Sequence, residues 1–206
     1  MSKPFFEVFP NLQLNTDIHD LMGQTEVERV SATKRRDFLR VYLKSTRLIQ
    51  KADIWTAEQE IKKQFFPDAN LTVKIYENFE LSEKYNPENL MDIYKESILE
   101  EFREYSHIQY NALKTARIEY PADNEMLITM EDTVLNRSME GEILQILEKI
   151  LVERCGFSVK LHAAYVEKEA GRFKEEEEAK IRMKVDAIYS RTRGRKEEAV
   201  DSTAPA

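Results

Sequence analysis

Apolar and polar positions alternate along several short stretches of the chain, and each such stretch predicts a β-strand. The clearest has Leu39, Val41 and Leu43 alternating with polar residues, and a weaker one precedes it around residues 27–33. Residues 34–37 are predicted to form the turn between these two strands. Further strands are predicted at about residues 71–76, 117–120, 126–130 and 159–163.

Apolar residues spaced three and four apart predict helices between these strands. Asn15 or Thr16 is suited to cap a short helix that Gly23 closes. Thr56 and Gln59 have the spacing of a capping box for a second helix. The remaining predicted helices span about residues 87–105, starting with Asn86 and Pro87, about residues 143–155, closed by a left-handed Gly156, and a charged stretch over residues 167–191.

The predicted elements occur in an order that repeats: helix, strand, strand, short helical turn, helix, strand. This order covers residues 15–79 and again 87–165, and the closing strands share the similar strings LTVKI and FSVKL, although short strands can also resemble each other by chance. Because a sheet with one apolar face needs helices to cover it, we predict two small α+β domains in tandem. Their bounds are residues 1–80 and 85–166, and a charged helix and linker follow in 167–206.

The order α-β-β-α-α-β is that of a type II KH domain, which binds single-stranded nucleic acid through a Gly-x-x-Gly loop. At the corresponding places, residues 136–141 contain one glycine and residues 50–53 contain none. The five glycines of the chain are all at least fifteen residues apart, which excludes phosphate loops and nucleophile elbows built on closely spaced glycines. We therefore predict two KH-like domains without KH-type RNA binding.

Residue types that carry out chemistry are few and scattered. His19, His107, His162 and the single Cys155 do not form a metal-binding pattern, and Cys155 ends a predicted helix, where the helix dipole disfavours a thiolate. We predict no catalytic residue, no metal site and no cofactor in this chain. A lone cysteine and the lack of a long apolar run indicate a cytoplasmic protein.

Charge is distributed unevenly along the chain. The net charge of −7 argues against a protein whose main task is to coat nucleic acid. Residues 26–51 nevertheless carry eight bases and three acids, whereas residues 80–105 carry eight acids and three bases. The basic segment is either a surface for an acidic partner or a nucleic-acid backbone, or a solvated hairpin that faces the acidic helix, and we favour the second interpretation.

Two groups of residues are candidates for binding a partner. Near the N-terminus, apolar residues interrupted by Pro4 and Pro10 predict an extended arm, which either packs on its own domain or docks on another protein. The second group lies in the basic hairpin. The candidate partner-binding residues are Phe5, Phe6, Phe9, Arg35, Arg36 and Arg40.

Several strings of core and turn residues resemble a known family. They are Phe5-Phe6-Glu7-Val8-Phe9, Val27-Glu28-Arg29-Val30, Leu71-Thr72-Val73-Lys74-Ile75-Tyr76-Glu77, Leu90-Met91-Asp92-Ile93-Tyr94-Lys95, Glu131-Asp132-Thr133 and Glu153-Arg154-Cys155-Gly156-Phe157. In this order they resemble the N-terminal region of the PolC-type DNA polymerase III alpha subunit of low-GC Gram-positive bacteria. The resemblance covers about residues 3–195.

The resemblance implies two N-terminal domains ahead of an OB-fold, an exonuclease and the polymerase proper. We find neither those parts nor the carboxylates that hold two metal ions for nucleotidyl transfer, so we expect a detached front end that ends in the linker before the OB-fold. The family implies a non-catalytic module that docks replisome proteins, such as the clamp-loader tau subunit, and contacts DNA through the other parts of the parent chain. An alternative is an auxiliary module that binds single-stranded nucleic acid and guides template to the polymerase. An independent enzyme fits least well.

Overall fold

The computed structural model describes residues 2–167. The strands are β1 (Lys3–Pro4), β2 (Glu26–Ala32), β3 (Phe38–Ser45), β4 (Thr72–Phe79), β5 (Arg117–Ala122), β6 (Glu125–Glu131) and β7 (Lys160–Val166). The helices are α1 (Phe5–Val8), α2 (Thr16–Met22), α3 (Lys51–Phe65), α4 (Pro87–Tyr105), α5 (His107–Thr115) and α6 (Val134–Glu148), which continues into the π-helical turn η1 (Lys149–Arg154). The predicted charged helix and linker lie outside the described residues from residue 168 onward.

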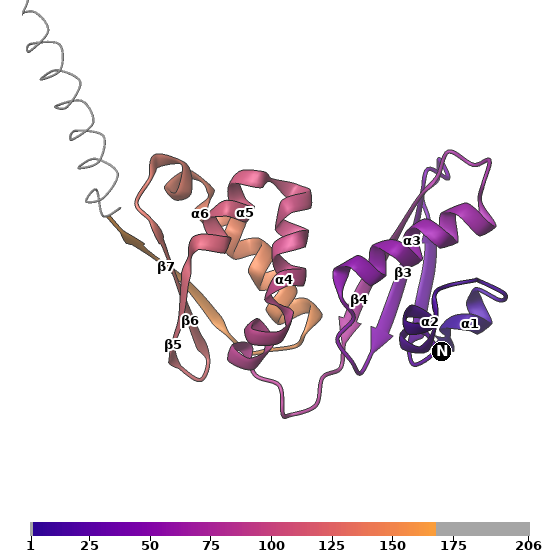
Figure 1. Ribbon diagram of the computed structural model, residues 1–206, viewed down its shortest axis with the longest axis horizontal. Coiled ribbons are helices and arrows are strands. Elements are labelled where there is room, and N and C mark those ends of the chain that lie inside the picture. Colours follow the sequence, from indigo (N-terminus) through magenta and orange to yellow (C-terminus); the bar gives the residue numbers. More distant parts are fainter. Residues whose placement is uncertain (1, 168–206) are drawn as a thin grey trace, which may run out of the picture. The chain divides into compact units, whose positions relative to one another are not determined.

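The strands form two small mixed sheets. The first has the order β1-β2-β3-β4 and the second β5-β6-β7. In both sheets an antiparallel hairpin is followed by a helix and a parallel strand, so that α3 connects β3 to β4 and α6 connects β6 to β7 (Figure 1). The predicted α+β class and the repeated hairpin–helix–strand order are confirmed. All described strands and helices belong to one compact unit, Met1–Val166, and the division at residues 80–85 stays a prediction.

The KH-like order is not confirmed. Where it needs two helices between the second and third strands of a sheet, the described residues show the single helix α3, or α6 running on into η1. Residues 50–53 lie at the start of α3 and residues 136–141 inside α6, so neither stretch is a loop between helices. Gly141 does not break α6, because its exposed position has open space around it and the buried Ile143 and Leu147 continue the helical pattern.

Most predicted helix ends are confirmed by their hydrogen bonds. The side chain of Asn15 accepts from the Ile18 N–H at 2.8 Å, and Gly156 closes η1 with φ of 75°. Helix α3, however, begins at Lys51 and places Thr56 in its interior, where the hydroxyl donates to the Ala52 carbonyl. The predicted capping box of Thr56 is therefore wrong, because a threonine inside a helix can satisfy its hydroxyl on the carbonyl four residues earlier.

The core lies between each sheet and its helices. In the first sheet it includes Val41, Leu43, Val73 and Ile75 of the strands and Ile54, Ala57 and Ile61 of α3, and in the second it includes Met126, Ile128 and Met130 of β6 with Leu90, Ile98, Phe102, Ile143 and Leu147 of the helices. These residues follow the alternating pattern of strands and the three-to-four spacing of helices that the sequence shows. Burial of each of the larger side chains in this set, that is all but Ala57, stabilises the fold by roughly 1.5–3 kcal/mol.

The N-terminal arm packs on its own domain, but it is not extended. After β1 the chain makes the one-turn helix α1, in which the Phe9 N–H donates to the Phe5 carbonyl at 3.0 Å. This turn brings the rings of Phe5 and Phe9 to 5.1 Å from each other. Phe5 is 0% exposed, and the ring of Phe9 lies 5.8 Å from that of Phe65 on α3. The packing of four-apart aromatic rings explains why a short helix replaces the extended arm.

We expect Phe5→Ala to lower the free energy of unfolding by about 3–5 kcal/mol, because truncating a fully buried aromatic ring leaves a cavity. Phe65→Ala is the matched control, since that ring is 37% exposed, and its loss should be clearly smaller. Urea unfolding followed by circular dichroism measures both. Equal losses for the two variants would contradict the packing of the arm.

Candidate interaction surfaces

One face of the first sheet carries aromatic and basic side chains that alternate along β3. Side chains of a strand point to opposite faces in turn, and on β3 Val41 and Leu43 are buried. Phe38, Arg40 and Tyr42 occupy the opposite, more exposed face. On β4, Tyr76 shares this face and is 47% exposed. We call this surface the open face.

A stacked column crosses the open face from strand to strand. Arg29 of β2, Tyr42 of β3 and Tyr76 of β4 are register partners. The Arg29 guanidinium lies 4.1 Å from the centre of the Tyr42 ring, and the Tyr42 and Tyr76 rings stack at 5.3 Å with 20° between their planes. We call these residues the Arg29–Tyr42–Tyr76 column.

The basic hairpin between β2 and β3 forms the predicted turn. Thr33 donates its hydroxyl to the Asp37 carboxylate, and Arg36 adopts φ of 56° within the turn. Arg35, Arg36 and Arg40 are exposed, and none of them makes an ion pair within residues 2–167. Their cationic groups are therefore available to an external anionic group.

The structure does not pair this hairpin with the acidic helix α4. Of the bases in residues 26–51, Lys51 contacts Glu101 of α4 at 3.9 Å, whereas Lys44 pairs with Glu80. Glu101 of α4 also pairs with Arg154, and Glu104 of α4 pairs with Lys74. Lys51 at the start of α3 is thus the base of this segment that pairs with α4. The turn residues make no such contact with α4 in the described part of the chain.

The aromatic candidates lie mostly inside the molecule. Phe5 and Phe9 are buried, and the half-buried Phe6 stacks on His19 at 4.4 Å between ring centres. Binding of a partner by these three residues stays a prediction, whereas Arg35 and Arg36 lie on the surface.

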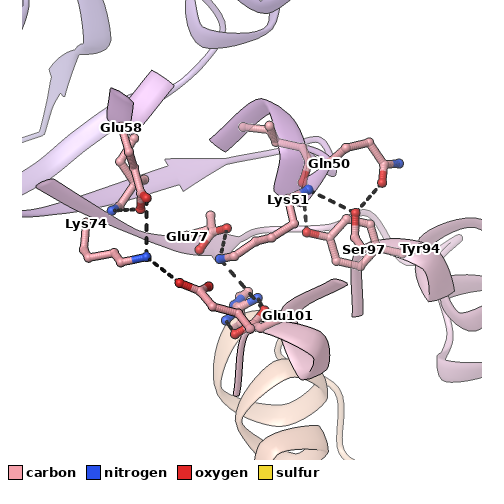
Figure 2. A network of polar contacts seen from close by, with 12 residues as sticks. Gln50, Lys51, Glu58, Lys74, Glu77, Tyr94, Ser97 and Glu101 are labelled. Atoms are coloured by element: carbon pink, nitrogen blue, oxygen red, sulfur yellow. Dashed lines mark hydrogen bonds and ion pairs between the residues drawn. The ribbon is translucent and has the colours of Figure 1, made fainter. Parts of the chain in front are cut away.

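A buried chain of alternating charges joins β4 and α3 to α4 and η1 (Figure 2). The Lys51 ammonium lies 2.8 Å from Glu77 and 3.9 Å from Glu101. Arg154 of η1 donates two hydrogen bonds to the Glu101 carboxylate, at 2.8 and 2.9 Å. We call these four residues the ionic chain. Their charges sum to zero, so each buried ion has a partner of opposite sign.

Hydrogen bonds between uncharged groups also connect the start of α3 to α4. The Lys51 N–H donates to the Ser97 hydroxyl at 3.0 Å, and this hydroxyl donates to the Gln50 side chain. The buried Tyr94 hydroxyl donates to the Ile49 carbonyl at 2.8 Å. The start of α3 is therefore fixed to α4 through both main-chain and side-chain groups (Figure 2).

Local environment shifts the pKa of several groups. Burial disfavours the charged form of Glu101, but the hydrogen bonds and charge of Arg154 outweigh it and hold the pKa of Glu101 below its ordinary value. Burial raises the pKa of Glu58, despite the bond it accepts from the Ile75 N–H. Burial also raises the pKa of the Cys155 thiol to about 12, which leaves the thiol neutral at pH 7 and a poor nucleophile.

The described residues contain no group of three or more His, Cys, Asp or Glu side chains arranged to hold a metal ion. Among the helices of this part of the chain, none is long and apolar enough to cross a membrane.

The sequence held a signal for the ionic chain that the pattern analysis missed. Glu77 falls on the buried side of β4 between Ile75 and Phe79, and Glu101 occupies the buried side of α4 three residues after Ile98. A charged residue at a position where the pattern demands an apolar one indicates a buried ion that needs a partner. The pattern does not identify the partner.

We expect Glu101→Gln to lower the free energy of unfolding by about 3–5 kcal/mol at pH 7, because it leaves the largely buried Arg154 without the carboxylate it pairs with. Glu101 has a lowered pKa in the folded state, so its contribution is complete above the ordinary value of 4.5 and is lost as the pH falls through the lower folded value. The difference between wild type and variant should therefore shrink at pH 3.

Urea unfolding at pH 7 and pH 3 measures this difference. Glu104→Gln is the control, because this half-exposed acid of the same helix pairs with Lys74 at the surface and should cost less than about 1 kcal/mol. A Glu101→Gln effect that matches the Glu104→Gln effect at pH 7 would show that the ionic chain is not coupled to folding.

Comparison with known protein families gives a match for the first part of the chain. Residues 4–75 match the family model described as DNA polymerase III polC-type N-terminus I. The match runs from β1 into β4 and includes Arg35, Arg36 and Arg40 of the basic hairpin. No curated protein and no solved structure matches the chain. Residues 4–75 are thus similar to the N-terminus I region of polC-type DNA polymerase III, as the resemblance of the sequence indicates.

Proposed function

We propose that the chain is a non-catalytic N-terminal interaction module of a PolC-type DNA polymerase III alpha subunit, working in the cytoplasm. It docks other replisome subunits, such as the clamp-loader tau, while the other parts of the parent chain synthesise and proofread DNA. The observation that carries the proposal is the exposed basic hairpin within the family-matched segment. Arg35, Arg36 and Arg40 have no internal ionic partner among residues 2–167 and are held on a packed α+β scaffold.

Docking on this hairpin works by charge complementarity. Exposed cations on a rigid turn raise the rate of encounter with an acidic surface, and the effect weakens as salt screens the charges. The turn is preformed, because Thr33 bonds both the Asp37 carboxylate and the Asp37 N–H. Little conformational freedom is therefore lost when Arg35 and Arg36 meet a partner.

We expect immobilised tau subunit to retain the chain, and the double variant Arg35→Glu, Arg36→Glu to bind about tenfold or more weakly, mainly through a slower association rate. Surface plasmon resonance at two salt concentrations measures rate and affinity. The double variant Arg117→Glu, Lys160→Glu is the control, because it makes the same change of charge on exposed positions of the second sheet. Retention of neither tau nor any other replisome protein would end the proposal.

The open face supports a second candidate function, an auxiliary module for single-stranded nucleic acid. Along β3, Phe38, Arg40, Tyr42 and Lys44 alternate aromatic and cationic groups on one face. Proteins that bind single strands without sequence preference combine such stacking side chains with cations that follow the backbone. Phe38 is 40% exposed, so its ring is accessible to a base.

For this second function we expect a fluorescently labelled oligo(dT) to bind the chain at low salt, with an affinity that falls steeply as salt rises. Phe38→Ala should weaken binding by roughly 5- to 100-fold, the range for one stacked base. Fluorescence anisotropy at 50 and 200 mM salt measures this, with Val134→Ala as a control at an exposed apolar residue of α6. A flat titration at both salt concentrations rejects the nucleic-acid function.

A further inference from the structure

A cleft of about 870 Å³ lies next to the Arg29–Tyr42–Tyr76 column. Tyr42 and Tyr76 line it from the first sheet, and Gln109, Glu142 and Glu153 line it from the helices that follow. Glu77, Glu101 and Arg154 of the ionic chain line the cleft as well. The contacts of Figure 2 therefore also position the walls of this cleft.

The cleft carries an excess of negative charge. Glu77 and Glu101 are neutralised by Lys51 and Arg154. The acids that remain are Glu28, Glu142 and Glu153, and Lys149 is the cation left to oppose them. None of these four groups makes an ion pair within the described part of the chain. The cleft therefore disfavours a phosphate and favours a cation.

One buried acceptor in the wall lacks a donor. Gln109 is 4% exposed, and its amide N–H donates to the Glu142 carboxylate at 2.5 Å. This bond fixes the orientation of the amide, because a carboxylate accepts and cannot donate. The amide oxygen of Gln109 then has no hydrogen-bond partner in the described structure. A group entering here to complete its bonding has to be a donor.

The column leaves an aromatic surface open at its end. Tyr42 covers one face of the Tyr76 ring, and β4 is the last strand of its sheet, so no further strand follows. Among the described residues no ring and no cation stacks on the other face of Tyr76. Arg29, stacked on Tyr42 at the opposite end, shows that a guanidinium fits this kind of column.

We propose that the cleft binds an arginine side chain from a basic segment of a partner protein, with its guanidinium stacked on Tyr76. The guanidinium is planar and cationic and carries several N–H donors, so it matches the open ring, the acids Glu142 and Glu153, and the unpaired oxygen of Gln109. This inference rests on the proposed docking function and names the partner chemistry of a second surface, opposite in charge to the basic hairpin.

The test is titration of the full chain with three hexapeptides. In each peptide glycine alternates with one other residue, which is arginine in the first, citrulline in the second and lysine in the third. Citrulline keeps the plane and donors of arginine without the charge, and lysine keeps the charge without the plane. We expect the arginine peptide to bind best, the lysine peptide about threefold or more weakly, and the citrulline peptide at least tenfold more weakly. Isothermal calorimetry gives the affinities, and amide chemical shifts locate the site.

Tyr76→Leu should weaken binding of the arginine peptide by about 3- to 10-fold. Tyr76→Phe retains the aromatic ring and should therefore retain the affinity for this peptide. Tyr85→Leu, on the loop before α4 and outside the cleft lining, is the matched control and should change nothing. If Tyr76→Leu does not fold, Glu153→Gln at an exposed position tests the charge, with an expected loss of about two- to threefold, and Glu148→Gln is its control.

Three results would overturn the inference: no binding of the arginine peptide, equal binding of the citrulline peptide, or an affinity that Tyr76→Leu and Glu153→Gln leave unchanged. Binding of oligo(dT) that depends on Tyr76, without binding of the peptide, would assign the cleft to nucleic acid instead. The docking proposal fails separately, through loss of tau retention. A chain that binds tau through Arg35 and Arg36 but ignores the peptide keeps the function and loses this site.

Discussion

The ionic chain of Glu77, Lys51, Glu101 and Arg154 is the contact on which the arrangement of surfaces depends. A buried charge is costly unless an opposite charge and hydrogen bonds compensate it, and here each ion is compensated by one from another element. The bidentate hydrogen bond from Arg154 to Glu101 also fixes the relative orientation of the two side chains, because a guanidinium and a carboxylate pair in a narrow range of geometries. The ionic chain thus fixes η1 and α4 beside β4.

The exposed edge of β4 is protected by the neighbouring charges. Edge strands present unpaired main-chain groups that attract other strands. Here the Glu58 carboxylate accepts from the Ile75 N–H at 2.7 Å, and Lys74 connects Glu58 to Glu104 of α4. A partner that approaches this side therefore meets side chains and not a free strand edge. This favours recognition by stacking and charge over the addition of a strand.

Local patterns predicted the fold where they act within one element. Alternation located β3 and β4, and Asn86 and Pro87 located the start of α4, because strand pleat and helix capping are set by neighbouring residues. The sequence pattern did not predict features of the structure that depend on contacts between separate elements. The start of α3 at Lys51 depends on bonds to Ser97 of another helix, and the burial of Phe5 depends on rings of separate segments.

The candidate surfaces were predictable to different degrees for the same reason. Arg35, Arg36 and Arg40 are close in sequence, so composition alone indicates a basic hairpin. The acidic cleft assembles residues from β2 to η1, and apart from the buried Glu77 and Glu101 none of them is unusual in its own segment. Buried charges such as Glu77 and Glu101 were the signal that such a long-range site exists, but the pairing follows from the fold and not from spacing along the chain.

The two charged surfaces also differ in how they relate to the family match. The matched segment, residues 4–75, holds the basic hairpin and the Arg29 and Tyr42 members of the column. Tyr76 and the helical wall with Gln109 and Glu142 lie beyond it. The hairpin lies within the matched segment, whereas the cleft also needs α4, α5, α6 and η1, which follow that segment. The ionic chain holds α4 and η1 against β4. Net charge conceals both surfaces, because the bases of one offset the acids of the other.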